Sequence, residues 1–299
     1  MDEAALAGFG PGFEVINAPH LVEARAELLA ALSDAAALIV RNRTQVDRAL
    51  LDAAPALRAV GRLGVGLDNI DVAACKARGI QVCPATGANA ASVAEYVITA
   101  ALMLVRGAFQ AQGPMLEGAW PRAMLSEGRE IGGLCMGLVG FGATAQAVAT
   151  RAKALGMAVL AHDPLLGPDD PAWALAERCS LQDVLAGADV LSLHLPLSAQ
   201  TKGLISTEAL AALPEGAVVI NAARGGILDE AALAEALKTG RLGGAALDVF
   251  EDEPLGPEAA ARFTDVPNLI LSPHIAGLTR QSNARVSETV VARVKEALS

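Results

Sequence analysis

Three groups of polar residues in the last third of the chain have the types needed for proton transfer beside an anionic substrate. Arg224 follows the apolar run AVVINAA, several acids lie within DVFEDEP (248–254), and His274 follows LILS. An imidazole carries a proton near neutral pH, an arginine orients a carboxylate, and a carboxylate stabilises an imidazolium. This set suits the interconversion of an alcohol and a ketone. Any of four acids could stand beside His274: Asp248, Glu251, Asp252 and Glu253.

A glycine-rich turn predicts the cofactor for such a reaction. Gly140, Gly142 and Ala145 form G-x-G-x-x-A between an apolar run and a helical segment. The first glycine permits a tight turn, the second permits close approach of a pyrophosphate, and the small third residue lets helix and strand pack. Asp163 ends the next apolar run, about 20 residues further on, where its carboxylate could accept the ribose hydroxyls and would repel a 2′-phosphate. We therefore expect NAD rather than NADP.

The elements that must position these residues alternate between short apolar runs and alanine-rich helical segments. Apolar strands separated by helices indicate parallel β-α-β units covered on both faces. Two sets of such units are separated by one long helical segment, which we expect over 91–111. The expected strands lie at 36–40, 57–64 and 80–85, and then within 134–142, 158–164, 189–196, 217–223, 244–250 and 269–276. This pattern predicts two α/β domains with a cleft between them.

Composition narrows the class of protein further. The formal charge of −10 argues against nucleic acid as a partner, because phosphates require clustered Lys and Arg. The 4 cysteines form no CxxC pair and no zinc-like spacing, so we expect no metal site. The first residues lack a basic stretch followed by an apolar run, and the longest apolar stretch, 96–105, is too short to span a bilayer. We therefore expect a cytoplasmic protein without a membrane partner.

Eight segments of the chain resemble those of one enzyme family and follow each other in the family's order. They are GRLGVGLDNID, GANAASVAEY, GLVGFGATAQAVA, HDP, LHLPLSAQT, NAARGGILDEAAL, GAALDVFEDEP and LSPHIAG. They resemble the D-isomer-specific 2-hydroxyacid dehydrogenases, and the branch that they resemble most is the D-3-phosphoglycerate dehydrogenases. The resemblance covers nearly the whole chain from Ala36 onward. One departure concerns the substrate: after His274 the chain reads IAGLT, where the phosphoglycerate enzymes have a GAST pattern.

The resemblance implies an α/β fold of two doubly wound parallel-sheet domains. A flavodoxin-like substrate-binding domain would comprise residues 1–90 and be completed by a C-terminal helix at 279–299. A Rossmann dinucleotide-binding domain would comprise residues 91–278. The family also implies a homodimer, since Trp120 resembles a position near the partner subunit.

The resemblance also implies a catalytic trio of Arg224, Glu253 and His274, and so selects Glu253 among the four acids. Neutral His274 would take the hydroxyl proton during oxidation, and its imidazolium would return that proton during reduction. The carboxylate of Glu253 would stabilise the imidazolium. Arg224 would hold the carboxylate and carbonyl oxygens of the substrate and polarise the keto form.

Further residues are expected to bind the cofactor and the substrate. Successive N–H groups at Val65 and Gly66 could cradle a carboxylate, and Arg41 could reach an anionic tail, although an ordinary turn and a surface charge explain these residues as well. The expected cofactor contacts are Gly140, Gly142, Ala143, Thr144 and Asp163, to which the resemblance adds His194, Pro196, Ala222 and Asp248.

Together these features predict an NAD-dependent oxidoreductase that interconverts a D-2-hydroxyacid and its 2-keto acid. The first candidate substrate is 3-phosphoglycerate. The same residues would serve glyoxylate, hydroxypyruvate, sulfolactate or phosphite. An alternative from another class is a non-catalytic, NAD-sensing binding protein like the corepressors of this family.

Overall fold

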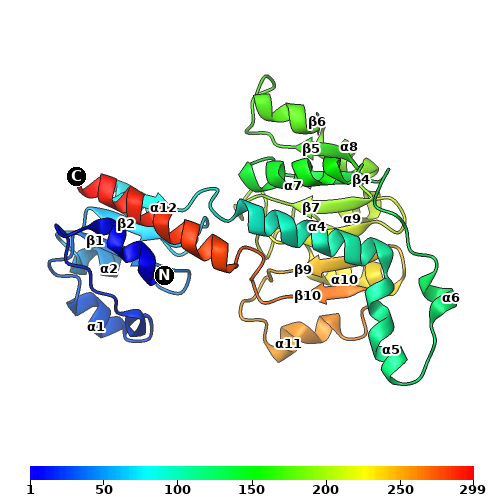
Figure 1. Cartoon of the computed structure of the whole chain (residues 1–299), viewed down its shortest axis with the longest axis horizontal. Coiled ribbons are helices and arrows are strands. Elements are labelled where there is room, and N and C mark those ends of the chain that lie inside the picture. Colours follow the sequence, from blue (N-terminus) through cyan, green and yellow to red (C-terminus); the bar gives the residue numbers. More distant parts are fainter. The chain divides into compact units, whose positions relative to one another are not determined.

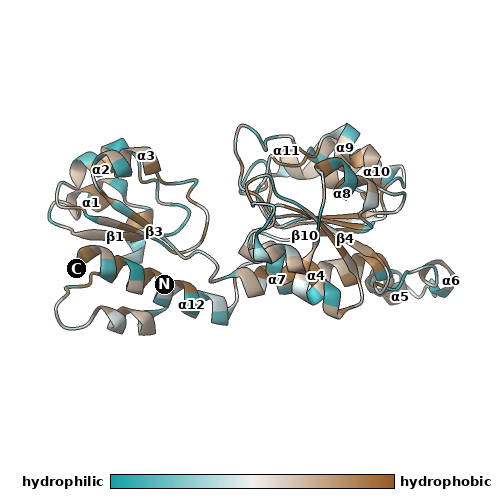
Figure 2. Cartoon of the chain, turned by 90° about the horizontal axis from the view of Figure 1, so that it is seen from above, coloured by the Kyte–Doolittle hydropathy of each residue, from teal (hydrophilic) through white to brown (hydrophobic).

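The computed structural model describes residues 1–299 and divides into two compact units. Unit 1 comprises Met1–Asn89 and Leu278–Ser299, and unit 2 comprises Ala90–Gly277. Figures 1 and 2 show each unit as a parallel sheet with helices on both faces. The predicted α/β fold class is therefore confirmed.

Unit 1 is built on a three-stranded parallel sheet of order β1-β2-β3. Its strands are β1 (Ala37–Val40), β2 (Ala59–Arg62) and β3 (Gln81–Pro84). Its helices are α1 (Arg25–Ala30), α2 (Arg48–Ala53), α3 (Val72–Ala77) and α12 (Arg280–Leu298), with the 3₁₀ turns η1 (Glu3–Phe9) and η2 (Pro19–Val22). Side-chain caps from Asp47, Asp71 and Thr279 satisfy free N–H groups at the starts of α2, α3 and α12.

The C-terminal helix of unit 1 packs directly on the middle strand. Gly61 lies in β2, and a Cβ there would come within 2.6 Å of Val290 and 2.9 Å of Val294 on α12. Val290 and Val294 are fully buried. On the other face of the sheet, Leu50 and Cys75 bring α2 and α3 into a second apolar layer. Helix α12 can therefore pack on the N-terminal sheet only because residue 61 is a glycine and has no side chain.

Unit 2 contains a seven-stranded parallel sheet of order β10-β9-β8-β7-β4-β5-β6. Its strands are β4 (Cys135–Val139), β5 (Ala158–His162), β6 (Glu177–Arg178), β7 (Val190–Leu193), β8 (Val218–Asn221), β9 (Gly244–Leu247) and β10 (Leu269–Leu271). The strand order reverses between β4 and β7, which is the topological switch point of a Rossmann sheet. Ligands of such sheets bind at the carboxyl ends of the strands.

Two layers of helices cover this sheet (Figure 2). One layer contains α4 (Ala90–Arg106) and α7 (Ala143–Ala154), and the other contains α8 (Leu181–Gly187), α9 (Thr207–Ala212) and α10 (Glu230–Lys238). The shorter helical elements are η3 (Ala108–Ala111), α5 (Gln112–Leu116), α6 (Arg122–Leu125), η4 (Pro171–Leu175), α11 (Pro257–Ala260) and η5 (Ala261–Phe263). Both interfaces are aliphatic and include fully buried Leu138, Val148 and Leu233.

The long helix expected over 91–111 is shorter than predicted. Helix α4 ends at Arg106 because Gly107 has φ +64°, a left-handed conformation that ends helices. The chain then continues through η3 and α5. Periodicity extended the prediction too far because residues 108–111 are as favourable for a helix as those before Gly107.

The described chain contains no single helix that is long and apolar enough to cross a membrane. Only a pair bent by 66°, Ala90–Arg106 with Ala108–Leu116, reaches the necessary length and composition when the two parts are counted together. Much of its first part is buried in the core of unit 2.

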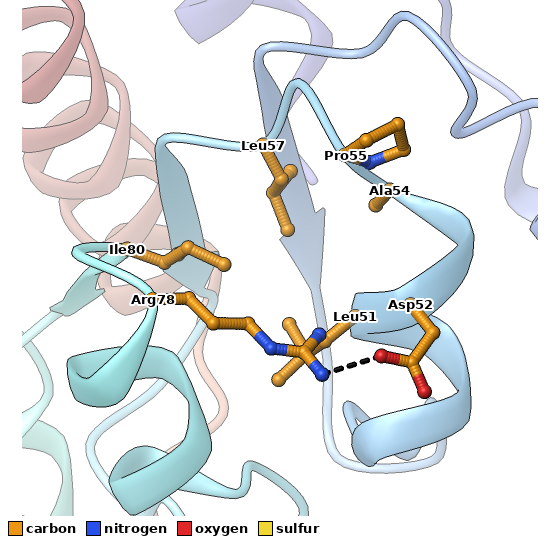
Figure 3. A pocket seen from close by; sticks show the side chains of 7 residues that line it. All are labelled: Leu51, Asp52, Ala54, Pro55, Leu57, Arg78 and Ile80. Carbon is orange, nitrogen blue, oxygen red and sulfur yellow. Dashed lines mark hydrogen bonds and ion pairs between the residues drawn. The ribbon is translucent and has the colours of Figure 1, made fainter.

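Unit 1 has a pocket at the amino ends of its strands (Figure 3). Leu57 and Ile80 line it, and the Arg78 guanidinium donates to the Asp52 carboxylate across it at 2.5 Å. This pocket lies at the opposite ends of β2 and β3 from Val65, where the sequence predicts substrate binding.

Candidate active site

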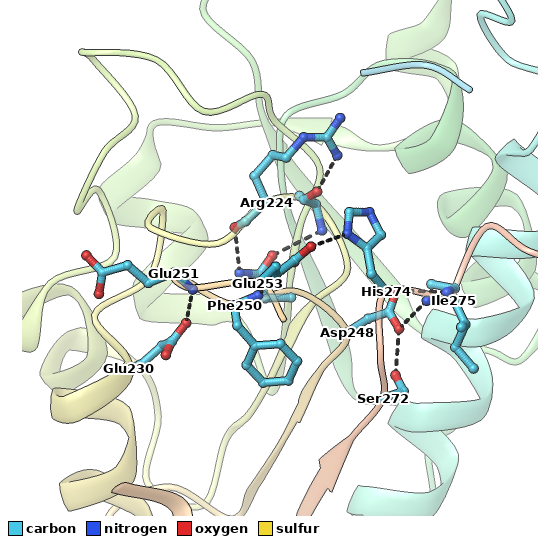
Figure 4. Close-up of polar contacts among 12 residues, drawn as sticks. Arg224, Glu230, Asp248, Phe250, Glu251, Glu253, Ser272, His274 and Ile275 are labelled. Carbon is cyan, nitrogen blue, oxygen red and sulfur yellow. Dashed lines mark hydrogen bonds and ion pairs between the residues drawn. The ribbon is translucent and has the colours of Figure 1, made fainter. Parts of the chain in front are cut away.

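Arg224, Glu253 and His274 follow three neighbouring strands of unit 2. Arg224 lies just after β8, Glu253 lies in the loop after β9, and His274 lies just after β10. The carboxyl ends of these parallel strands lie at one edge of the sheet. The predicted trio is therefore brought to a single edge, where Figure 4 shows the side chains.

His274 and Glu253 form a direct pair. The Nδ1 atom of His274 lies 2.7 Å from Oε2 of Glu253, and the two side chains are 43% and 34% exposed. The backbone N–H of Phe250 donates to the other carboxylate oxygen of Glu253 at 3.1 Å. Because Glu253 occupies Nδ1, the remaining ring nitrogen, Nε2, is the one available to a substrate hydroxyl. Among the four candidate acids, Glu253 is the one that contacts the imidazole.

The backbone of His274 is held by a buried carboxylate. His274 has φ +55°, a conformation that is uncommon for residues other than glycine and that needs support from its surroundings. Asp248, only 1% exposed, accepts hydrogen bonds from the backbone N–H groups of Ile275 and Ala276, both at 2.8 Å. The backbone oxygen of Asp248 accepts from the His274 N–H at 2.8 Å. Asp248 thus fixes the chain on both sides of the imidazole.

A hydroxyl chain extends from this carboxylate to helix α4. Ser272 Oγ donates to Asp248 Oδ1 at 2.6 Å, and Tyr96 lies 2.7 Å from Ser272 Oγ. Since Ser272 gives its proton to Asp248, Tyr96 is the donor to Ser272. Burial raises the pKa of Tyr96, which keeps this donor protonated. The predicted contact of Asp248 with the cofactor stays a prediction, and its carboxylate already accepts three hydrogen bonds within the protein.

The arginine loop packs tightly on the loop that carries Glu253. The Asn221 side chain donates to the Arg224 backbone oxygen at 2.9 Å and accepts from the Ala223 N–H at 3.1 Å. The Arg224 guanidinium donates to the Ala223 oxygen at 2.6 Å. A Cβ at Gly225 would come within 1.8 Å of the Phe250 oxygen, so only glycine permits this approach. The two loops are therefore in backbone contact.

Four side chains that hold these loops were not identified from the sequence: Asn221, Glu230, Ser272 and Tyr96. Asn221 lies near the end of the predicted strand AVVINAA, and Ser272 ends the apolar run LILS. Each is close to a predicted catalytic residue, and this proximity is the signal that could have identified them. Glu230 and Tyr96 lie on helices, where nothing in the local pattern separates them from ordinary helix residues.

The glycine turn after β4 has room for a phosphate group. Gly140 has φ +87°, and a Cβ there would meet the His194 oxygen at 2.5 Å. In contrast, a Cβ at Gly142 would meet no atom within 4 Å. Gly142 is the N-cap of α7 and provides no side-chain cap, so the first N–H groups of the helix, at Ala143 and Thr144, are not bonded by a capping side chain. The turn therefore fits the pyrophosphate of a dinucleotide.

Asp163 and His194 flank this turn. Asp163 directly follows β5, and its carboxylate accepts from the N–H groups of Phe141 and Leu165 at 2.8 and 2.9 Å. His194 directly follows β7, and its Nε2 lies 2.9 Å from Ser192 Oγ. Burial lowers the pKa of His194 to about 4, so the ring is neutral at physiological pH. The other predicted cofactor residues, Pro196 and Ala222, follow β7 and β8 at the same edge.

The predicted substrate residues of unit 1 lie at the carboxyl edge of its own sheet. Arg41 follows β1 directly, and Val65 and Gly66 lie in the turn after β2. The buried Asn69 side chain connects the two loops by donating to the backbone oxygens of Arg41 and Thr44 at 2.8 and 2.6 Å. The Arg41 side chain is exposed and donates to Asn283 on α12 at 3.3 Å.

Comparisons with known proteins agree with this geometry. Residues 98–276 match the family model of the D-isomer specific 2-hydroxyacid dehydrogenase, NAD binding domain. The (S)-sulfolactate dehydrogenase of Chromohalobacter salexigens is 52% identical over 299 residues, covering 100% of this chain and 96% of the relative. The D-3-phosphoglycerate dehydrogenase of Mycobacterium leprae is 40% identical and covers 99% of this chain. This chain spans about half, 55%, of that relative's length.

Solved structures give the same result. D-lactate dehydrogenase from Aquifex aeolicus, complexed with NAD and lactic acid, has a TM-score of 0.79 and 28% identity, and the match covers 93% of this chain and 91% of that chain. The NAD-dependent formate dehydrogenase from Staphylococcus aureus, in complex with NAD, has a TM-score of 0.81 and 27% identity, with 99% and 88% covered.

The sequence resemblance placed the phosphoglycerate enzymes first, whereas identity is higher with the sulfolactate enzyme. At the level of the family, the motifs, the fold and both kinds of comparison agree. The chain belongs to the D-isomer-specific 2-hydroxyacid dehydrogenases, a family of NAD-dependent oxidoreductases.

Proposed function

We propose that this enzyme oxidises (S)-3-sulfolactate to 3-sulfopyruvate with NAD. The observation that carries the proposal is the 52% identity to an (S)-sulfolactate dehydrogenase along 100% of this chain and 96% of that relative. The D-3-phosphoglycerate dehydrogenase of Mycobacterium leprae reaches 40%, and this chain covers 55% of it. The segment IAGLT after His274 also departs from the phosphoglycerate pattern.

The stereochemical descriptor of this substrate agrees with a D-specific enzyme. In lactate the carboxyl group has priority over the methyl group, and the D isomer is R. In 3-sulfolactate the sulfur-bearing methylene has priority over the carboxyl group. The same arrangement in space is therefore named S, and (S)-sulfolactate presents its hydrogen, hydroxyl and carboxylate as D-lactate does.

The proposed mechanism assigns one task to each member of the trio. Neutral His274 takes the hydroxyl proton at Nε2, while Nδ1 stays bonded to Glu253 at 2.7 Å. The Glu253 carboxylate stabilises the resulting imidazolium and orients the ring. Arg224 binds the substrate carboxylate and the oxygen that becomes the carbonyl. Bound NAD supplies the hydride acceptor for the carbon that bears this oxygen.

We assign the cofactor to the edge formed by β4, β5 and β7. The N–H groups at the start of α7 would bind its pyrophosphate, for which the space above Gly142 leaves room. The Asp163 carboxylate would accept the ribose hydroxyls and disfavour a 2′-phosphate. His194, Pro196 and Ala222 would line the same edge.

For the sulfonate we propose residues of unit 1. A sulfonate stays ionised at every physiological pH, so the substrate carries two negative charges. Arg41 is an exposed cation at the carboxyl end of β1 and would bind the sulfonate. The N–H groups of Val65 and Gly66 would bind the carboxylate together with Arg224. The two charges are the features that distinguish this substrate from lactate or glyoxylate.

We also propose that the enzyme is a cytoplasmic homodimer. The segment that includes α5 and α6 stands apart from the sheet of unit 2 (Figure 2). It exposes large apolar side chains: Phe109 (64%), Leu116 (81%), Trp120 (75%) and Met124 (64%). An apolar surface of this kind favours a partner, and a second copy of the chain would cover it. The four cysteines are all free, as expected in a reducing compartment.

A substrate panel tests the proposal directly. NADH formation would be measured with both enantiomers of 3-sulfolactate, 3-phosphoglycerate, D-lactate and D-glycerate, and NADH consumption with glyoxylate and hydroxypyruvate. We expect the highest kcat/KM with (S)-sulfolactate and at least about tenfold lower values with D-lactate, which lacks one charged contact. A higher kcat/KM with 3-phosphoglycerate would overturn the substrate assignment. No turnover with any acid would favour the NAD-sensing alternative.

A further inference from the structure

The loop that carries Glu253 is held by a second, buried carboxylate that the mechanism does not use. Glu230 begins helix α10 and is only 5% exposed. Its Oε1 accepts the backbone N–H of Glu251 at 2.7 Å, two residues before Glu253 (Figure 4). The Arg262 guanidinium, from η5, donates to its Oε2 at 3.1 Å. Glu230 thus joins three segments at one point.

The same loop is restrained at two further points. The Phe250 N–H donates to Glu253 Oε1, and the Phe250 oxygen faces Gly225, where a Cβ would approach within 1.8 Å. Residues 250 and 251 are therefore fixed by Gly225 on one side and Glu230 on the other. Gly225 and Glu230 belong to one segment, which runs from the end of β8 to the first residue of α10 and also carries Arg224.

The buried Glu230 carboxylate has both a cation and acidic groups around it. Arg262 is the cation that contacts it, while Glu251 and Asp252 are acidic neighbours. Burial raises the pKa of Glu230, although the Glu251 N–H and Arg262 oppose that shift. Burial of a carboxylate is costly unless it is paired and hydrogen-bonded, and here the Glu251 N–H and Arg262 provide those partners. An apolar residue at the start of α10 would leave the Glu251 N–H without its acceptor.

From this geometry we infer that Glu230, oriented by Arg262, is a positioning residue for the proton relay. By holding the Glu251 backbone, Glu230 keeps the Glu253 carboxylate on Nδ1 of His274. The inference rests on the proposed roles of Glu253 and His274. It adds a residue that touches neither substrate nor cofactor and acts only through the loop.

The experiment measures the imidazole of His274 itself. The chain has 4 histidines, so their ring-nitrogen NMR signals can be separated at one fixed alkaline pH, and His274→Gln assigns the signals of His274. These signals report which ring nitrogen carries the proton, and a hydrogen bond from Nδ1 to Glu253 favours the proton on Nδ1. Glu253→Ala serves as the reference, because loss of the carboxylate removes this preference. Glu235→Ala is the matched control, since Glu235 lies on the exposed face of the same helix. Steady-state kinetics and thermal unfolding accompany each spectrum.

In Glu230→Ala we expect part of the His274 population to move its proton from Nδ1 to Nε2, in the same direction as in Glu253→Ala but to a smaller extent. We expect kcat to fall about tenfold or more, because a displaced catalytic pair loses rate steeply. In Glu230→Gln the amide oxygen can still accept the Glu251 N–H, so most of the wild-type proton distribution and kcat should return. If Glu230→Ala does not fold, Arg262→Met decides the question with the same two measurements and the same expected direction.

An unchanged proton position on His274 in Glu230→Ala, beside a changed one in Glu253→Ala, would overturn the inference. An equal loss in Glu230→Gln and Glu230→Ala would also overturn it, because the Glu251 N–H would then not be the group that matters. The NMR measurement requires no turnover. Failure of the proposed function, seen as absence of NADH formation by the wild type, is therefore distinguishable from failure of this inference.

Discussion

The carboxyl edges of the two sheets are built differently. In unit 2, three loops are tied together by side chains that are almost completely buried: Asn221 (2%), Glu230 (5%) and Asp248 (1%). In unit 1, one buried side chain, Asn69, joins the two loops. Two cations of that edge are exposed to solvent: Arg41 is exposed, and the Arg43–Glu23 ion pair is 62% and 67% exposed.

In the proposed function the buried edge of unit 2 carries out proton transfer and the exposed edge of unit 1 selects the substrate. Proton transfer needs atoms held to a fraction of an ångström, which buried and fully bonded loops provide. Charge recognition tolerates longer side chains that adjust to a ligand, which exposed arginines provide. We therefore expect changes in unit 2 to lower turnover of every substrate, and changes in unit 1 to alter which substrate is preferred.

The largest effect should come from Arg224→Met. This variant removes the cation that orients the substrate and polarises its carbonyl, so kcat should fall by about 10²–10³ with sulfolactate and lactate alike. Arg224→Lys keeps the charge without the two-pronged geometry and should recover only part of the loss. Steady-state kinetics with both acids measure this. A loss confined to sulfolactate would show that Arg224 binds the sulfonate, and the contrast between the two edges would fail.

A smaller and selective effect is expected from Arg41→Met. Loss of one charged contact should raise KM for sulfolactate about tenfold, since a hydrogen bond to a charged group contributes roughly 1.5–3 kcal/mol. The kinetics with lactate, which has no second charge, should not change. Arg48→Met, which removes a cation that is 83% exposed in the same unit, is the control. Equal losses with both acids would contradict a role of Arg41 in selectivity.

The smallest effect concerns stability. His194 belongs to the ordered edge of unit 2 but does not take part in proton transfer. Burial lowers the pKa of His194 to about 4 in the folded state. Between about pH 6.5 and pH 4 the ring is therefore protonated in the unfolded chain and neutral in the native protein. As pH falls from about 6.5 to about 4, the wild type should lose on the order of 2 kcal/mol through this group. This loss of stability is smaller than the full pKa shift of His194 implies, because the side chain is only half-buried and water reduces the cost of its charge.

His194→Gln tests this because it removes the titrating ring and keeps an acceptor for Ser192. Denaturant unfolding at pH 7 and pH 4.5 measures the free energy of unfolding. The variant should lose less stability on acidification than the wild type. A parallel loss in both proteins would show that His194 is solvated.

The sequence predicted the ordered edge well, for physical reasons. Glycine is required at position 140, where a Cβ would meet the His194 oxygen at 2.5 Å, and at position 142 a side chain would fill the space that we assign to the pyrophosphate. Both conditions depend on single positions at a fixed spacing, which a sequence shows directly. Parallel strands also bring whatever follows them to one edge, which is why Arg224 and His274 could be associated without a structure. The pairing of His274 with Glu253, rather than with Glu251 or Asp252, depended on the family resemblance.

Other features could not be predicted from the pattern. The end of α4 at Arg106 depends on the left-handed conformation of one glycine within an otherwise helical pattern. The contact of Glu230 with the Glu251 N–H joins residues far apart in the sequence, and a glutamate in the first turn of a helix is ordinarily a solvated charge. In the proposed function substrate choice depends on exposed side chains such as Arg41, whose positions the strand pattern does not determine.

The most direct test of the account is the turnover of His274→Ala, measured together with NAD binding by titration calorimetry. We predict that kcat for NADH formation falls by about 10²–10⁴, because the proton of the substrate hydroxyl loses its acceptor. NAD should bind as in the wild type, since the glycine turn and Asp163 are untouched. Wild-type turnover in His274→Ala would contradict the proton relay, and with it the role proposed for Glu253.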